Sequence, residues 1–134
     1  MRRKYILDAG FLSAFFAGVL ESKRYMDEVY EKVSEAYISE INLAEFLYNY
    51  ARVFGWESTL VRNKLIRNSP IIVVSPDEKQ TIEAARIKLK YYDRLSLADS
   101  YLVALAIMLK GIIVTTDARI ENVIEVPVEV IRIP

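Results

Sequence analysis

Four acidic residues lie in sequence surroundings that are unusual for a solvent-exposed charge. Asp8 and Asp117 each follow a short apolar run, so each stands where a predicted strand ends. Glu45 and Asp99 lie within largely apolar segments that have helical periodicity. Buried carboxylates repel one another unless a cation is present, and carboxylate oxygens are the ligands that Mg²⁺ and Mn²⁺ prefer. The four acids therefore predict a site for a hard divalent cation.

The composition excludes several other kinds of chemistry. The 134 residues include no His and no Cys, with 18 Lys and Arg against 18 Asp and Glu. A catalytic imidazole, a thiolate nucleophile and a cysteine-bound metal are therefore impossible. The hydrophobic fraction of 53% is enough for a packed core. Any metal in this chain must be held by oxygen ligands.

Short apolar segments alternate along the chain with longer segments of helical pattern. The predicted strands are 4–7, 36–38, 71–74, 112–115 and 126–133. The predicted helices are 11–18, 22–34, 40–54, 56–67, 75–90 and 96–109. This alternation predicts a three-layer α/β/α fold, in which a mostly parallel sheet of about five strands has helices on both faces. We expect a single domain over residues 1–134.

The strand and helix signals also predict local details. The continuous apolar run 71–74 indicates a strand buried on both faces, and Pro127 places the last strand at a sheet edge. Ser75 is the predicted cap of the helix that follows strand 71–74. In sheets of this class, ligands bind at the carboxyl ends of the strands, near a switch in strand order. That edge is where Asp8 and Asp117 are expected.

Each acid also has a purely structural explanation. Asp8 can cap the following helix, and Asp117 can stabilise a turn. Asp99 stands three residues after Ser96 and completes a capping box, whereas Glu45 can face solvent or pair with a base. Because two acids follow strands and two lie on apolar helices, a shared site explains them better than four separate structural roles.

Four segments, in order along nearly the whole chain, resemble the motifs of PIN-domain ribonucleases, specifically the VapC-type toxins of toxin–antitoxin pairs. The segments are YILDA (5–9), ISEINLAEF (38–46), LSLADSYLVALA (95–106) and GIIVTTD (111–117). In the second motif the functional acid precedes the final apolar residue, which assigns Glu45 and not Glu40. Two positions depart from the family pattern, because Ala9 replaces a small polar residue and Ile120 replaces an aromatic one.

The resemblance implies a metal-dependent endoribonuclease with a PIN-like fold. It implies that Asp8, Asp99 and Asp117 bind Mg²⁺ or Mn²⁺, that Glu45 is a further ligand or a base, and that Thr115 supports the site by a hydrogen bond. The absence of a further acid directly after Asp117 leaves one or two metal ions as alternatives.

The resemblance also implies three kinds of partner: an RNA substrate, a cognate antitoxin protein and a second copy of the chain in a homodimer. The basic residues 2–4 followed by the apolar run 11–20 superficially resemble a signal peptide. Asp8 interrupts the apolar stretch between them, no clear cleavage site follows Leu20, and no run is long enough to span a membrane. We therefore expect a cytoplasmic protein with no membrane partner.

Two other classes of α/β protein require residues that this chain lacks. A haloacid-dehalogenase-type phosphatase requires a second Asp two residues after Asp8, where the chain has Gly10. A receiver-type domain requires an Asp at the end of strand 71–74, which is followed by Ser75 and Pro76. The alternatives that remain are a housekeeping PIN nuclease in RNA processing and a non-catalytic PIN-like binding module.

Two groups of basic and aromatic residues are candidates for RNA contact. They are Arg62, Lys64 and Arg67, and Arg86, Lys88, Lys90, Tyr91, Tyr92 and Arg94. The net charge of zero favours ordinary solvated helix faces for both groups.

Overall fold

The computed structural model describes residues 2–133 and contains five strands, six α-helices and one 3₁₀-helix in that range. The strands are β1 (Arg3–Leu7), β2 (Ser34–Ser39), β3 (Ile72–Val74), β4 (Ile112–Thr115) and β5 (Val128–Val130). The helices are α1 (Ala9–Phe16), α2 (Leu20–Tyr30), α3 (Glu40–Phe54), α4 (Trp56–Arg67), α5 (Glu78–Lys90), α6 (Leu97–Leu109) and the 3₁₀-helix η1 (Ala118–Asn122).

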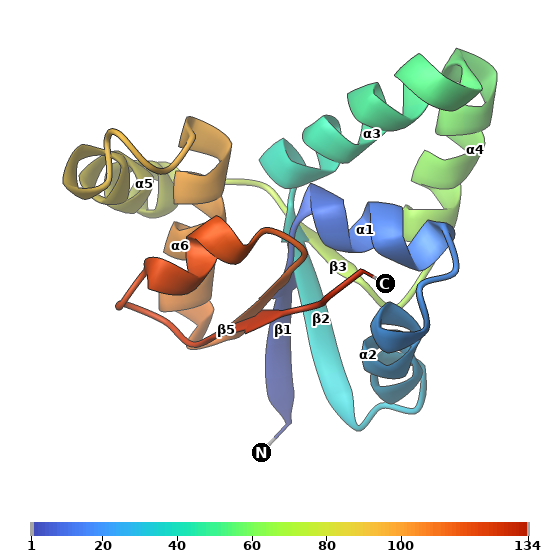
Figure 1. The fold of residues 1–134 in the computed structure, drawn as a ribbon, viewed down its shortest axis with the longest axis horizontal. Coiled ribbons are helices and arrows are strands. Elements are labelled where there is room, and N and C mark those ends of the chain that lie inside the picture. Colours follow the sequence, from blue (N-terminus) through green and yellow to red (C-terminus); the bar gives the residue numbers. More distant parts are fainter. Residues whose placement is uncertain (1, 134) are drawn as a thin grey trace.

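The strands form one parallel sheet between two layers of helices, as Figure 1 shows. Alternation along β1 directs Tyr5 and Leu7 to a core that includes residues of α1, α2, α3 and α4. Ile6 points to the other face, where it packs in a second core with residues of α5 and α6. The three-layer α/β/α fold expected from the sequence is confirmed.

The strand order β3-β2-β1-β4-β5 has its switch at β1. From β1 the chain builds outward through β2 and β3, and it then returns to add β4 on the other side of β1. Leu7 pairs with Val114 in register, so the residues that follow these two strands are neighbours at the carboxyl edge of the sheet. This edge is the expected place for a ligand in a parallel sheet.

Of three local features expected from the sequence, the structure contains one and differs in two. The prediction that segment 71–74 is buried on both faces was wrong, because β3 is an edge strand and Ile72 is 47% exposed. The prediction of Ser75 as a helix cap was also wrong. The carboxylate of Asp77 accepts from the backbone N–H of Gln80 at 2.8 Å, which starts α5 at residue 78. The edge position of β5, predicted from Pro127, is confirmed.

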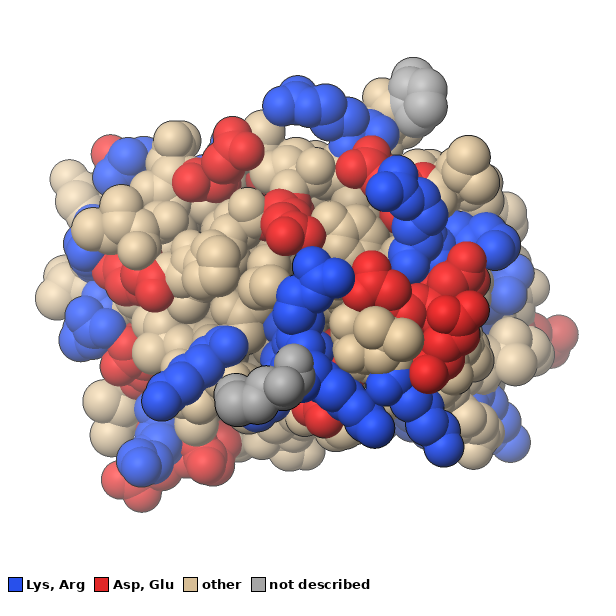
Figure 2. Space-filling view, turned by 90° about the horizontal axis from the view of Figure 1, so that it is seen from below, with Lys and Arg blue, Asp and Glu red and all other residues tan. Residues whose placement is uncertain are grey.

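The surface has no dominant sign of charge on the face seen in Figure 2. Lys and Arg side chains alternate there with Asp and Glu, and uncharged side chains separate them. This mixture agrees with the net charge of zero. In residues 2–133, no helix is both long and apolar enough to cross a membrane.

Candidate active site

The four acids predicted from the sequence line one open cavity at the carboxyl edge of the sheet. Asp8 follows β1 and Asp117 lies just beyond β4, whereas Glu45 and Asp99 lie on α3 and α6. Each acid is therefore positioned by a different element. The other residues that line the cavity are Ala9, Gly10, Arg94, Ser96, Thr116 and Arg119.

Asp8 is the most deeply placed of the four acids, with 7% of its surface exposed. Its Oδ1 accepts from the backbone N–H of Phe11 at 2.8 Å, so Asp8 caps α1. Its Oδ2 accepts a short hydrogen bond from the hydroxyl of Thr115. The structural explanation of Asp8 as a helix cap is therefore correct, and the same carboxylate also reaches the cavity.

Thr115 connects the two strands that carry the first and last acids. Its hydroxyl is fully buried, donates to Asp8 and accepts from the backbone N–H of Asp117 at 2.9 Å. A hydroxyl group can donate one hydrogen bond and accept another at the same time. The single side chain of Thr115 therefore fixes the positions of both Asp8 and Asp117. Thr115 does not line the cavity, so its contribution here is to orient the acids.

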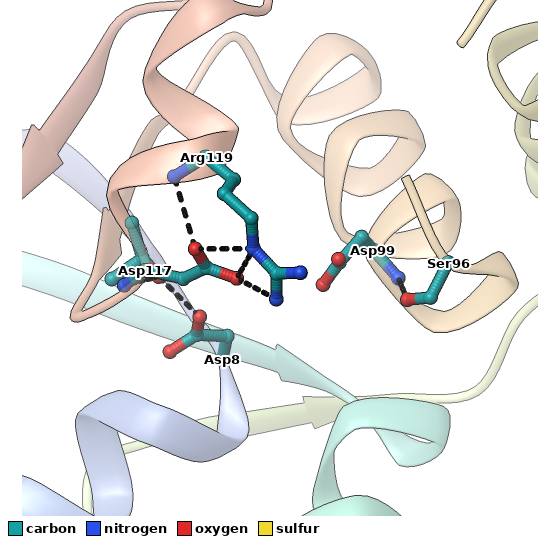
Figure 3. Close-up of polar contacts among 6 residues, drawn as sticks. Asp8, Ser96, Asp99, Asp117 and Arg119 are labelled. Atoms are coloured by element: carbon teal, nitrogen blue, oxygen red, sulfur yellow. Dashed lines mark hydrogen bonds and ion pairs between the residues drawn. The ribbon is translucent and has the colours of Figure 1, made fainter. Parts of the chain in front are cut away.

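Asp99 lies in the first turn of α6. Its backbone N–H donates to the Oγ of Ser96 at 3.0 Å, which is the capping contact expected from the sequence (Figure 3). The carboxylate of Asp99 points from α6 towards Asp117 and Arg119 (Figure 3). Capping and cavity formation are therefore compatible at this residue.

Glu45 is held by a residue that the sequence did not indicate. The Nδ2 of Asn42, which is fully buried, donates to Glu45 Oε1 at 3.2 Å and to the carbonyl oxygen of Ala98 at 3.3 Å. Ala98 is adjacent to Asp99, so Asn42 connects α3 and α6 beside two of the acids. The available signal was a polar side chain on the apolar face of its helix, three residues before Glu45.

Asp117 pairs with Arg119, a second residue that the sequence did not indicate. Asp117 Oδ1 accepts from Nε of Arg119 at 3.0 Å, and Oδ2 accepts from Nη2 at 2.8 Å. The backbone N–H of Arg119 also donates to Oδ1, at 2.9 Å, which makes Asp117 the cap of η1. Figure 3 shows the guanidinium lying between the carboxylates of Asp117 and Asp99.

The acids differ in the direction of their pKa shifts. Burial raises the pKa of Asp8 to about 6, and the charges of Asp99 and Glu45 add to this shift. Hydrogen bonds from Thr115 and from the backbone of Phe11 oppose it without cancelling it. Asp8 therefore holds its charge at an energetic cost when no cation is bound.

The pKa values of the remaining acids shift for the same kinds of reason, namely burial and neighbouring charges. Burial raises the pKa of Asp99 and of Glu45, and a neighbouring carboxylate adds to the shift in each case. The pKa of Asp117 is lowered instead, because Arg119 hydrogen-bonds to its charged form. Asp8, Glu45 and Asp99 thus have raised pKa values, whereas Asp117 has an ion-pair partner.

The cavity fits a hard divalent cation in charge and in donor type. All four acids offer carboxylate oxygens, and the raised pKa values of three of them reflect burial and uncompensated negative charge. In their present positions, however, no three acids among residues 2–133 are close enough together to hold one metal ion. Both oxygens of Asp117 already accept from Arg119.

Most of the predicted basic groups lie on solvated faces and have local partners. Arg67 pairs with Glu40 at 2.7 Å, and Lys90 pairs with Glu125 at 2.7 Å. Arg94 is the only member of these groups that lines the cavity. It is exposed, and its ion pair with Asp93 is long, at 3.9 Å.

A comparison with protein-family models matches the PIN domain over residues 5–126. The chain belongs to the PIN domain family. The matched range contains all four acids of the cavity. A search of the curated proteins finds no match.

Several solved structures are similar to this PIN domain. VapBC2 from Rickettsia felis, bound to a DNA fragment from its promoter, has a TM-score of 0.80 at 15% identity, covering 96% of this chain and 99% of that one. VapC20 from Mycobacterium tuberculosis, described as a sarcin–ricin loop cleaving toxin, has a TM-score of 0.72 at 15% identity, covering 91% and 98%. VapBC-5 from the same organism, of the VapBC family of toxin–antitoxin systems, has a TM-score of 0.66 at 15% identity, covering 96% and 98%. At these identities the similarity establishes the fold.

The pKa of Asp8 predicts how the stability of the PIN domain depends on pH without metal. Between its ordinary pKa of 3.8 and about 6, the folded protein retains a proton that the unfolded chain has lost. Raising the pH through this window therefore lowers the free energy of unfolding, by at most about 3 kcal/mol from this group. Asp8→Asn should remove this loss, since an amide still caps α1. Urea unfolding in EDTA at about pH 4 and about pH 7.5 measures the difference.

Asp117→Asn is the matched control for Asp8→Asn. The pKa of Asp117 is lowered, so its charge stabilises the folded state at neutral pH and this contribution is lost in acid. Relative to wild type, Asp117→Asn should therefore lose stability at about pH 7.5, which is the opposite sign from Asp8→Asn. Parallel pH curves for wild type and Asp8→Asn would contradict the burial argument.

The hydrogen bonds of Asn42 predict a stability effect. Asn42→Ala removes a fully buried side chain together with its hydrogen bonds to Glu45 and to the carbonyl oxygen of Ala98, which should cost about 1–3 kcal/mol. Asn49→Ala on the same helix is the control, because Asn49 is exposed and bonds only to the carbonyl oxygen of Glu45. Urea unfolding measures both. Equal stability of the two variants would show that Asn42 does not hold α3 against α6.

Proposed function

We propose that this PIN domain is a metal-dependent endoribonuclease and acts as the toxin of a type II toxin–antitoxin pair. The observation that carries the proposal is the cavity that four acids from four separate parts of the fold line together. Structural requirements alone explain each acid locally. They do not explain why Asp8, Glu45 and Asp99 share a place where each has a raised pKa.

The residues that would hold Mg²⁺ or Mn²⁺ are Asp8, Asp99 and Asp117, with Glu45 as a further ligand or as a base. When bound, the cation supplies Lewis-acid polarisation of the scissile phosphate and makes a water molecule acidic enough to lose a proton near neutral pH. This chemistry requires no His and no Cys, which agrees with the composition.

The protein groups around the acids have separate tasks in this proposal. Thr115 keeps Asp8 and Asp117 in register, and Asn42 keeps Glu45 beside α6. Glu45 is half-buried with a raised pKa, so it is suited to take a proton from the attacking water. Cleavage would leave a 5′-phosphate and a 3′-hydroxyl, as the family resemblance implies.

The toxin role is favoured over that of a housekeeping nuclease by the solved relatives. VapC20 is described as a toxin, and VapBC-5 as a member of a toxin–antitoxin family. The similarity covers 98% of each of those two chains. A homodimer is also proposed, and it is supported by exposed apolar side chains on α4, including Trp56 at 61% and Val61 at 60%.

The nuclease proposal predicts cleavage of an RNA hairpin or single strand in Mg²⁺ or Mn²⁺, and none in EDTA. Asp8→Asn/Asp99→Asn should reduce the rate by at least about 100-fold, because two proposed ligands lose their charge. The control is Asp27→Asn/Asp93→Asn, which neutralises two acids that do not line the cavity. Gel electrophoresis of end-labelled RNA measures the rate.

Two results would contradict the nuclease proposal. Equal cleavage by wild type and Asp8→Asn/Asp99→Asn would assign the activity to another site or to a contaminant. RNA that binds in Mn²⁺ but stays intact with all four acids present would favour a non-catalytic binding module.

The antitoxin partner is proposed to cover an apolar groove between α1, α3 and α4. The groove is lined by residues that include Phe16, Tyr50, Arg52, Val53, Phe54 and Arg62. Val53 and Phe54 are 73% and 60% exposed and adjoin each other in this groove, so they form part of one apolar surface. Arg62 lies over the ring of Phe16, with its carbon Cζ 4.6 Å from the ring centroid. Such a groove suits an apolar segment that also carries acidic residues.

The antitoxin proposal predicts co-purification with the product of a short reading frame adjacent to the gene, together with loss of RNA cleavage. Val53→Glu should weaken the complex by about tenfold or more, because it places a charge in the apolar groove. Leu89→Glu is the control, since Leu89 is equally exposed, at 76%, but lies on α5. Equal weakening by both variants, or by neither, would exclude the groove as the docking surface. Pull-down and calorimetry measure the effect.

A further inference from the structure

The side chain of Arg119 is held at the cavity by one ion pair, with Asp117. Its side chain is 79% exposed, whereas that of Asp117 is 29% exposed. Every side-chain hydrogen bond that the described structure gives Arg119 goes to Asp117. An exposed ion pair contributes little to stability, because solvent screens it and the long side chain loses freedom. The guanidinium can therefore leave Asp117 without disturbing the fold.

Two basic residues line the cavity, Arg94 and Arg119, and of these it is Arg119 that the described structure pairs with one of the cavity acids. Arg119 follows Asp117 by two residues and lies in the 3₁₀-helix η1, which Asp117 caps. Its guanidinium lies between Asp117 and Asp99 in Figure 3. Its charge also opposes the rise in the pKa of Asp99. Arg119 thus supplies, from within the chain, part of the positive charge that the cavity requires.

A divalent cation and Arg119 cannot both use the oxygens of Asp117 in the arrangement observed. Oδ1 accepts from the backbone N–H and Nε of Arg119, and Oδ2 accepts from Nε and Nη2, so Arg119 engages about all four lone pairs of the carboxylate. Any cation that binds Asp117 must displace at least one of these hydrogen bonds. The displaced guanidinium would remain at the cavity, where its planar fork matches the oxygens of a phosphate group.

Resting on the proposed function, we propose that Arg119 is a built-in counter-ion that exchanges with the metal. It holds Asp117 while no metal is bound, gives Asp117 up to the incoming divalent cation, and then positions the phosphate of the RNA substrate. Arg119 is therefore a positioning residue that makes metal binding weaker in the absence of RNA and substrate binding stronger in its presence.

The experiment compares Arg119→Gln with Arg86→Gln in the full chain. Arg86 forms a similar exposed ion pair, with Glu83, but it does not line the cavity. Calorimetric titration with Mn²⁺ alone, without RNA, should show Arg119→Gln binding about fivefold more tightly than wild type, because a competing ion pair and a repelling charge are removed. Arg86→Gln should bind as wild type does.

Cleavage kinetics at saturating Mn²⁺ provide a second, opposite readout. The value of kcat/KM for RNA should fall by about tenfold in Arg119→Gln, because a charged hydrogen bond to phosphate is lost. Arg119→Lys should recover part of it, since it keeps the charge without the fork. A structural role for Arg119 would not tighten metal binding while slowing cleavage.

The outcomes separate this inference from the proposed function. Mn²⁺ affinity that is equal in wild type and Arg119→Gln overturns the exchange, even when both cleave RNA. Unchanged kcat/KM in Arg119→Gln overturns the phosphate contact. Failure of wild type and of both Gln variants to bind Mn²⁺ overturns the metal-dependent function together with this inference.

Discussion

The arrangement of the site depends on the pairing of β1 with β4. Leu7 and Val114 are in register, so Asp8 and Thr115 follow them at the same level of the sheet. The buried hydroxyl of Thr115 then hydrogen-bonds with both Asp8 and the backbone of Asp117. Since these contacts lie at the switch in strand order, the helices that cross each face can bring further acids to the same edge.

The main energetic consequence of this arrangement is the cost of keeping several partly buried carboxylates ionised close to one another. Asp8, Glu45 and Asp99 are each desolvated, and each lies near another carboxylate, so their pKa values rise. Asp117 is the exception because Arg119 neutralises it. The cavity therefore combines uncompensated charge with a movable internal cation, a combination that favours ligands able to exchange with that cation.

Local and functional explanations turned out to coexist at the acids. Asp8 caps α1 and Ser96 caps the helix that carries Asp99, as their sequence contexts predict. Asp117, for which the sequence suggested a role in a turn, caps η1. A capping carboxylate uses one oxygen on backbone N–H groups, which leaves lone pairs for other partners. Helix caps at the carboxyl ends of parallel strands are thus well placed to serve a site as well.

The sequence by itself determined the element types, the α/β/α class and the four acids, because periodicity and strand-end positions are local properties of the chain. It did not determine the edge position of β3, which depends on strand order, or the Asp77 cap, where two local signals compete. Only the tertiary structure showed that Asn42 joins α3 to α6 and that the Arg119 guanidinium lies between Asp117 and Asp99. Those contacts join groups whose spatial relation is set by the packing of helices on the sheet, which no local pattern encodes.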